Sequence, residues 1–189
     1  MTKILIVGSR GSGKTTLANE RGKENGWISI DSGNPISTDR DNCILQNYIT
    51  TQKEYIQYTI CQHQNIKNTN VFLARGPENL YYYTIGYPIF NNRKWSIDKL
   101  MHNDLQELKK YFADLIIMLD LKKKEILNRC QSDSKVRTNM DMWINFWFNG
   151  EKQFFETFNN LIKVDTTGME IPDMVDHVIT ILKDRGILE

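Results

Sequence analysis

The stretch GSRGSGKT at residues 8–15 decides the fold. It satisfies the pattern GxxxxGK[ST] in full and follows KILIV (3–7), a short β-branched apolar run typical of a buried parallel strand. A helical pattern covers 15–24 and places Leu17 and Ala18 on its inner side. Because a strand, a glycine-rich loop and a helix stand in this order, the sequence predicts a phosphate-binding loop.

The residue types of this loop suit phosphate chemistry. Glycines let the backbone wrap closely, so that successive N–H groups and the helix N-terminus face the phosphates. Lys14 brings a mobile positive charge to the β- and γ-phosphate oxygens, and the Thr15 hydroxyl is a ligand for Mg²⁺. We therefore expect ATP and Mg²⁺ as cofactors, with Thr15 on the metal. The residues expected to hold the nucleotide are Gly8, Gly11, Ser12, Gly13, Lys14, Thr15 and Thr16.

Apolar runs alternate with helical patterns along the rest of the chain. Predicted strands cover 3–7, 27–30, 70–74, 113–119 and 161–164, and predicted helices cover 15–24, 43–65 (as one or two helices), 96–111, 122–130, 141–158 and 171–185. The aromatic stretch 76–92 is expected to be irregular. This alternation predicts an α/β fold, a three-layer α/β/α sandwich around a mainly parallel five-stranded sheet. With no linker or repeat, residues 1–189 are expected to form one domain.

Composition narrows the range of partners. The chain is 40% hydrophobic and 25% charged with a formal net charge of +1, so no overall field favours nucleic acid or an anionic membrane. Three cysteines lie far apart without metal-ligand spacing, and no signal peptide is present. The longest apolar run, at 115–119, is too short to cross a bilayer. We expect a cytoplasmic protein with no membrane partner.

Two other classes of phosphate-loop protein do not fit. Switch-type GTPases need DxxG after the third strand and a guanine-reading NKxD, and neither is present there. AAA and helicase machines carry an acidic pair at a strand end and are normally larger. In the order of its elements the chain resembles the nucleoside and nucleoside monophosphate kinases, especially the thymidylate kinase and deoxynucleoside kinase group and its small phage-type members. The resemblance covers most of the chain and implies a lid over about 122–140.

The resemblance gives roles to two strand ends. Asp31 closes the second predicted strand, where a carboxylate in this group takes the acceptor hydroxyl's proton and orients the oxygen for in-line attack. A turn-forming Asp before Ser32 is the alternative. Arg75 follows the third strand, where the group carries an Asp-Arg or Glu-Arg pair. There the arginine holds the substrate phosphate, or the carboxylate that acts as base.

Ala74 replaces the usual acid of that pair, which leaves the source of a carboxylate open. Glu78, just beyond the strand, is one replacement and Asp31 is another. The third alternative is that no acid is needed, because Thr15 with water and ATP oxygens can hold the ion. If the acceptor is already a phosphate, no base is required, and Asp31 orients it or helps to bind magnesium.

The lid and the last strand complete the expected site. In the resembled group, arginines of a basic lid cover the transferring phosphoryl group and stabilise its charge. Arg129, Lys135 and Arg137 match that region. Thr166 and Thr167 end the fifth strand, where the group places a loop beside the adenine.

An aromatic segment lies between Arg75 and the fourth strand. Its rings either stack on a nucleobase or pack in the core, and Tyr82 is the candidate substrate contact. The members are Tyr81, Tyr82, Tyr83, Tyr87, Phe90 and Trp95.

Together these features predict an ATP-dependent kinase acting on a nucleoside or nucleotide, with Lys14, Asp31, Arg75, Arg129 and Arg137 in catalytic roles. One alternative keeps the fold and phosphorylates a hydroxyl of a polynucleotide or a modified DNA base. Nucleic acid is not favoured as a substrate, because a net charge near zero does not indicate a basic groove. Another is a nucleotide-binding module without transfer activity, for which Ala74 is the main support. The resemblance also leaves a homodimer open.

Overall fold

Five parallel strands form the centre of the protein. The computed structural model describes residues 1–21, 27–31, 44–66, 69–132 and 139–188. The strand order is β2-β3-β1-β4-β5, and every neighbouring pair is parallel. The strands are β1 (Lys3–Val7), β2 (Trp27–Asp31), β3 (Asn70–Arg75), β4 (Leu115–Asp120) and β5 (Leu161–Asp165). The carboxyl ends of all five therefore meet at one edge of the sheet, with β1 in the middle.

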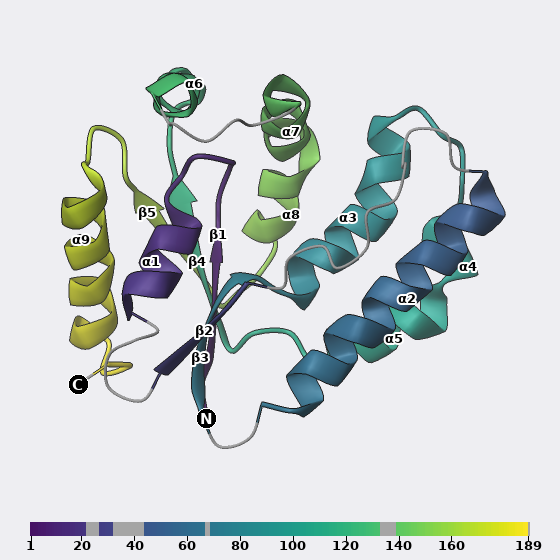
Figure 1. Ribbon diagram of the computed structural model, residues 1–189, viewed down its shortest axis with the longest axis horizontal. Helices are drawn as coiled ribbons and strands as arrows, with labels where there is room; N and C mark the ends of the chain where they lie inside the picture. Colours follow the sequence, from purple (N-terminus) through teal and green to yellow (C-terminus); the bar gives the residue numbers. More distant parts are fainter. Residues whose placement is uncertain (22–26, 32–43, 67–68, 133–138, 189) are drawn as a thin grey trace.

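Helices cover both faces of this sheet. Figure 1 shows α1 and α9 on one face and α3 and α8 on the other, with α2 and α5 packed outside α3. The helices are α1 (Lys14–Arg21), α2 (Leu45–Gln64), α3 (Pro77–Phe90), α4 (Ile97–Leu100), α5 (His102–Lys109), α6 (Lys123–Ser132), α7 (Met140–Phe146), α8 (Lys152–Glu156) and α9 (Ile171–Asp184). None of the helices within the described ranges is long and apolar enough to cross a membrane.

Side chains of the buried strands point alternately to the two faces of the sheet and form two separate cores. In β1, Ile4 and Ile6 pack with residues of α1 and α9, whereas Leu5 and Val7 pack with Trp147 and Phe155 near α8. Successive side chains of a strand point to opposite faces, so a strand that is apolar throughout requires cover on both sides. The predicted α/β sandwich with a five-stranded sheet is confirmed.

The expectation of an irregular segment at 76–92 is wrong, because α3 occupies most of it. Gly76 precedes Pro77, which pre-sets the first helical turn. The helix is apolar on most sides, since it lies between the sheet and the outer helices, and so it shows no amphipathic stripe. Pro88 cannot donate a bond to the Thr84 carbonyl, and the Tyr48 hydroxyl donates to that oxygen instead, at 2.9 Å.

Two predicted helices are each interrupted. The pattern at 96–111 forms α4 and α5, separated at Met101. The pattern at 141–158 forms α7 and α8, joined by a π-turn at Trp147–Glu151 and ending at Glu156. Gly150 leaves helical geometry inside this turn, with φ 177° and ψ −45°. Insertions of this kind are frequent at functional sites, and this one lies near the carboxyl edge of the sheet.

Candidate phosphoryl-transfer site

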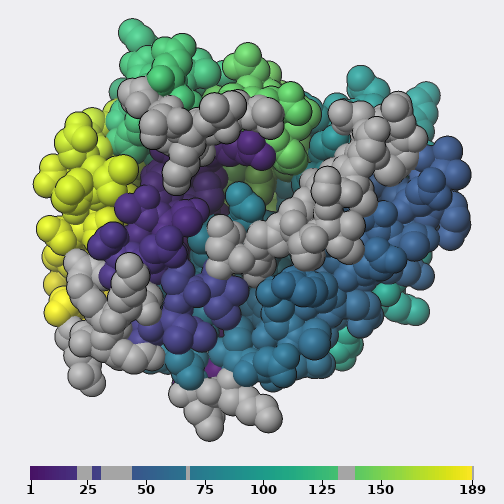
Figure 2. Space-filling view, in the orientation of Figure 1, coloured from purple at the N-terminus to yellow at the C-terminus, as the bar shows by residue number. Residues whose placement is uncertain are grey.

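The phosphate-binding loop joins the central strand β1 to α1. Gly11 and Gly13 have φ values of 79° and 94°, a region that favours glycine. At Gly13 a Cβ would lie 2.7 Å from the Cε of Met174, so the loop packs directly against α9. The loop and α1 reach the surface beside α9 in the space-filling view (Figure 2).

Two buried hydroxyls of the loop fit an anionic ligand. Ser9 and Ser12 are 2% and 0% exposed, and neither Oγ has a hydrogen-bond partner among the described residues. A buried hydroxyl without a partner is costly, and acceptor oxygens of a phosphate would remove that cost. The Lys14 ammonium donates to the carbonyls of Gly8 and Ser9, each at 2.8 Å. The loop therefore forms a cradle, and the Lys14 ammonium lies within it.

The start of α1 fits a magnesium ion held mainly by the nucleotide. Thr15 is exposed at the first turn of this helix, next to Lys14. No group of three or more His, Cys, Asp or Glu residues that could hold a metal occurs in the part of the chain that the structure describes. A threonine hydroxyl, phosphate oxygens and water are a usual magnesium environment, so Thr15 suits this ion.

Asp31 and Arg75 end neighbouring strands at the same edge. They are paired in the parallel register of β2 and β3, across an irregularity between Ile30 and Asp31. Arg75 is exposed. The carboxylate of Asp31, with Lys135 and Arg137 of the expected lid, lies outside the described residues. The backbone thus places Asp31 and Arg75 at neighbouring positions on one edge of the sheet.

The structure does not bring Glu78 to this edge. Glu78 lies fully buried in the first turn of α3, and its Oε1 accepts a hydrogen bond from the backbone N–H of Ala113, which precedes β4. Its Oε2 has no partner among the described atoms, and burial raises its pKa to about 7. Ala74 is 1% exposed and packs in the core shared with α1 and α9.

A carboxylate that the sequence analysis missed lies at the site instead. Glu151, at the end of the π-turn, accepts a hydrogen bond from the Asn79 side-chain amide at 3.0 Å. Burial raises the pKa of Glu151, and the bond from Asn79 and the charges of Lys14 and Arg75 act in the opposite direction. Lys14 and Arg75 are thus both close enough to stabilise its ionised form. The only sequence signal was Gly150, a glycine within an expected helix.

Tyr82 lies between two glycines next to this carboxylate. At Gly150 a Cβ would stand 1.9 Å from the Tyr82 hydroxyl oxygen, and at Gly86 it would stand 2.8 Å from the ring carbon Cζ. Phe146 and Phe154 pack against the same ring, with centroids 5.3 and 5.1 Å away. Burial and the charge of Glu151 raise the Tyr82 pKa. Tyr82 therefore fixes the π-turn as well as lying beside the site.

Replacing Gly150 with alanine is expected to destabilise the protein by about 1–3 kcal/mol, because the new methyl group would overlap the Tyr82 hydroxyl. Urea unfolding measures the loss. Tyr82→Phe removes the oxygen and leaves Cζ at 3.2 Å, so alanine at 150 should cost less in the Tyr82→Phe background. Equal costs in both backgrounds would contradict this arrangement.

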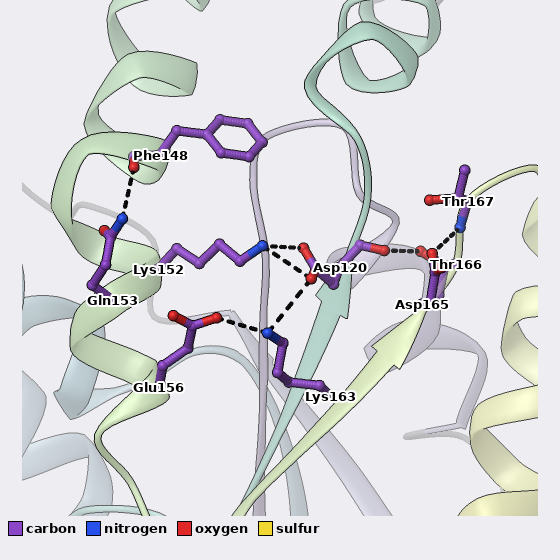
Figure 3. Close-up of polar contacts among 9 residues, drawn as sticks. All are labelled: Asp120, Phe148, Lys152, Gln153, Glu156, Lys163, Asp165, Thr166 and Thr167. Carbon is purple, nitrogen blue, oxygen red and sulfur yellow. Dashed lines mark hydrogen bonds and ion pairs between the residues drawn. The ribbon is translucent and has the colours of Figure 1, made fainter.

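Charged side chains tie α8 to the ends of β4 and β5. The Lys152 ammonium contacts both Asp120 oxygens, at 2.7 and 2.9 Å. Lys163 lies 3.8 Å from Asp120 and bonds to Glu156 at 2.7 Å (Figure 3). Because Lys152 follows Glu151 directly, this network holds the π-turn above the carboxyl edge of the sheet.

Arg129 bonds to the loop after β5. One of its guanidinium nitrogens contacts Glu125 at 2.7 Å and the carbonyls of Thr166 and Met169 at 3.2 and 2.6 Å. Glu125 in turn accepts the Gly168 N–H, at 2.9 Å. Of the two expected nucleotide contacts in this loop, Thr166 is buried and Thr167 is half-buried. Arg129 thus bonds to the backbone of the loop that carries Thr166 and Thr167.

No family model matches this sequence, and no curated protein is similar to it. Solved structures do match nearly the whole chain. Thymidylate kinase from Candida albicans has a TM-score of 0.67 at 19% identity, covering 100% of this chain and 93% of that one. Deoxyadenosine kinase from M. mycoides with dCMP and dCDP bound has a TM-score of 0.66 at 16% identity, covering 96% and 98%. The same kinase with dCTP bound has a TM-score of 0.61 at 17% identity, covering 96% and 99%. This chain has the fold of these P-loop nucleotide kinases.

Proposed function

We propose that this protein transfers the γ-phosphoryl group of ATP to a nucleoside or nucleotide. The observation that carries the proposal is the cradle with unpartnered buried hydroxyls, which lies at the same sheet edge as Arg75. A nucleotide-binding loop alone would need no second cation at the end of the neighbouring strand. The fold shared with thymidylate and deoxyadenosine kinases supports the same reaction class.

The residues divide into a donor side and an acceptor side. Lys14 and the N–H groups of the loop bind the phosphates, and Thr15 ligates the magnesium ion. When bound, MgATP supplies the transferable phosphoryl group. On the acceptor side, Arg75 clamps the acceptor through its planar donors, and Asp31 orients an acceptor hydroxyl and takes its proton.

The remaining expected residues close the site around the donor. Arg137 belongs to the lid and neutralises charge on the transferring group. Arg129 shapes the loop of Thr166 and Thr167 that faces the base. With water excluded, positioning and electrostatic stabilisation supply most of the catalysis, as in phosphoryl transfer generally.

The test incubates the protein with γ-labelled ATP, Mg²⁺ and separate acceptors: nucleosides, nucleoside monophosphates, single-stranded DNA and small alcohols. We expect labelled product with one or more nucleosides or monophosphates. If only DNA is labelled, the acceptor is a polynucleotide hydroxyl and not a nucleoside or nucleotide. ATP binding without transfer to any acceptor would show a nucleotide-binding module and contradict the proposal.

A further inference from the structure

We propose that Glu151 is the carboxylate that positions Arg75 and Lys14 for phosphoryl transfer in this chain, in place of an acid at the end of β3. The inference rests on the proposed function, since it assigns a positioning role within that same site. It concerns a residue on the π-turn between α7 and α8, which no strand-end pattern marks.

The first support is the hydrogen-bond chain from the turn after Arg75 to Glu151. The Gly76 N–H donates to the Asn79 Oδ1 at 3.1 Å, and the Asn79 Nδ2 donates to the Glu151 Oε1 at 3.0 Å. Gly76 directly follows Arg75, so a side chain from residue 151 is fixed to the end of β3. Its orientation is therefore determined relative to the strand that carries the arginine.

The second support is that the π-turn is held on both sides of Glu151. The Tyr82 hydroxyl occupies the space next to Gly150 that a Cβ would fill in any other residue. Lys152 bonds to both Asp120 oxygens at the end of β4 (Figure 3). A carboxylate fixed by its neighbours in the chain loses little rotamer freedom when it acts on a partner, which is the requirement for a positioning residue.

The third support is the charge around this carboxylate. Lys14 of the phosphate loop and Arg75 of β3 both stabilise its ionised form. Glu151 is half-buried, so water screens its charge less than it would at the open surface. Glu151 thus brings one negative charge within electrostatic range of both the donor-side cation and the acceptor-side cation.

Two other positions considered for this role, 78 and 74, point elsewhere. Glu78 bonds to Ala113 in the interior. The side chain at position 74 packs in the core toward α1 and α9, the face opposite to Trp147 and α8. An acid at 74 would therefore not occupy the place of Glu151. Among Glu78, Glu151 and position 74, it is Glu151 of the π-turn that hydrogen bonds connect to the end of β3.

The test compares Glu151→Gln and Glu151→Asp with Glu54→Gln, a control at an exposed glutamate of α2. Glutamine can still accept the bond from Asn79 but carries no charge. We expect Glu151→Gln to lower kcat/KM for the acceptor by about 100-fold, with an unchanged melting temperature. Glu151→Asp should fall between glutamine and wild type, and Glu54→Gln should match wild type. A lower melting temperature with weaker ATP binding would indicate a merely structural role and overturn the proposal.

Two further readouts separate this proposal from the proposed function. Glu151→Gln removes a negative charge near the phosphates, so ATP should bind about threefold to tenfold more tightly, which is measurable even if the wild type transfers nothing. An unchanged ATP affinity would overturn the role toward Lys14. If transfer occurs, Arg75→Gln and Arg75→Gln/Glu151→Gln should have nearly equal kcat/KM, because Glu151 acts through Arg75. If the two substitutions instead lower kcat/KM independently, so that their losses multiply in the double variant, Glu151 does not act through Arg75. That result would overturn its role toward Arg75.

Discussion

Replacing Lys14 with methionine is expected to lower phosphoryl transfer by about 10²–10³-fold, the loss typical of removing one group that stabilises transition-state charge. Lys14 is the loop's only lysine, and its ammonium already lies at the carbonyls of Gly8 and Ser9 inside the cradle. Methionine keeps the length and apolar stem of the side chain without the charge. Steady-state rates with labelled ATP and the best acceptor measure the effect.

Lys183→Met is the matched control for this variant. Lys183 is exposed in the last turn of α9, and its replacement removes the same charge from the chain. We expect wild-type rates for the control and wild-type circular dichroism for both variants. A Lys14→Met variant that is folded and retains more than about a tenth of wild-type turnover would contradict the role given to this lysine.

The free energy of unfolding is expected to respond to acid in opposite directions when Glu78 or His63 is replaced. His63 is 3% exposed, and neither ring nitrogen has a partner among the described residues. Burial, and secondarily the charge of Lys3, lowers its pKa from 6.5 to about 4. Between these values only the unfolded chain binds the proton, so stability is lost as pH falls from 6.5 to 4, by about 3 kcal/mol in total.

Glu78 has the opposite sign. Burial raises its pKa from 4.5 to about 7, against the bond from Ala113 and the charge of Lys3, while Asp114 adds slightly to the rise. Between pH 4.5 and 7 only the folded protein keeps the proton, so stability is lost as pH rises through this window. The magnitude is again about 3 kcal/mol, and the two effects largely cancel between pH 4.5 and 6.5.

The measurement is urea unfolding of wild type, Glu78→Gln and His63→Phe at several pH values from 4.5 to 7. Glu78→Gln should lose stability on acidification, because the destabilising effect of His63 is no longer offset by the opposite effect of Glu78. His63→Phe, which keeps a ring against Tyr111, should gain stability on acidification. Other groups, including Glu151, are common to all three proteins and cancel in the comparison. Identical slopes in the three proteins would show that neither group is buried as described.

The features that sequence predicted are those with a local physical cause. The strand at 3–7 is apolar from Ile4 to Val7 because both of its faces are covered, and the loop after it has the residue types that phosphate requires. The ends of the second and third strands, close to Asp31 and Arg75, also follow from local patterns. In each case a few neighbouring residues determine the outcome.

The features that sequence did not predict depend on distant packing. Helix α3 has no polar face, so its pattern did not differ from that of an aromatic loop. The π-turn at Trp147–Glu151 arises where Gly150 meets Tyr82, and no local pattern encodes that contact. Glu151 therefore looked like an ordinary helical residue. Arg129 did have a usable signal, its spacing of four residues from Glu125.

The position of β1 in the sheet has a consequence for how the protein folds. Its residues pair with β3, as Leu5 does with Leu73, and with β4, as Leu5 does with Ile116. Large loops must close before these pairings form, and such long-range closure is slow. The bond from Asn79 to Glu151 spans a further 72 residues. The phosphate loop, although encoded at residues 8–15, thus reaches its working surroundings only late in folding, when strands from most of the chain have assembled around it.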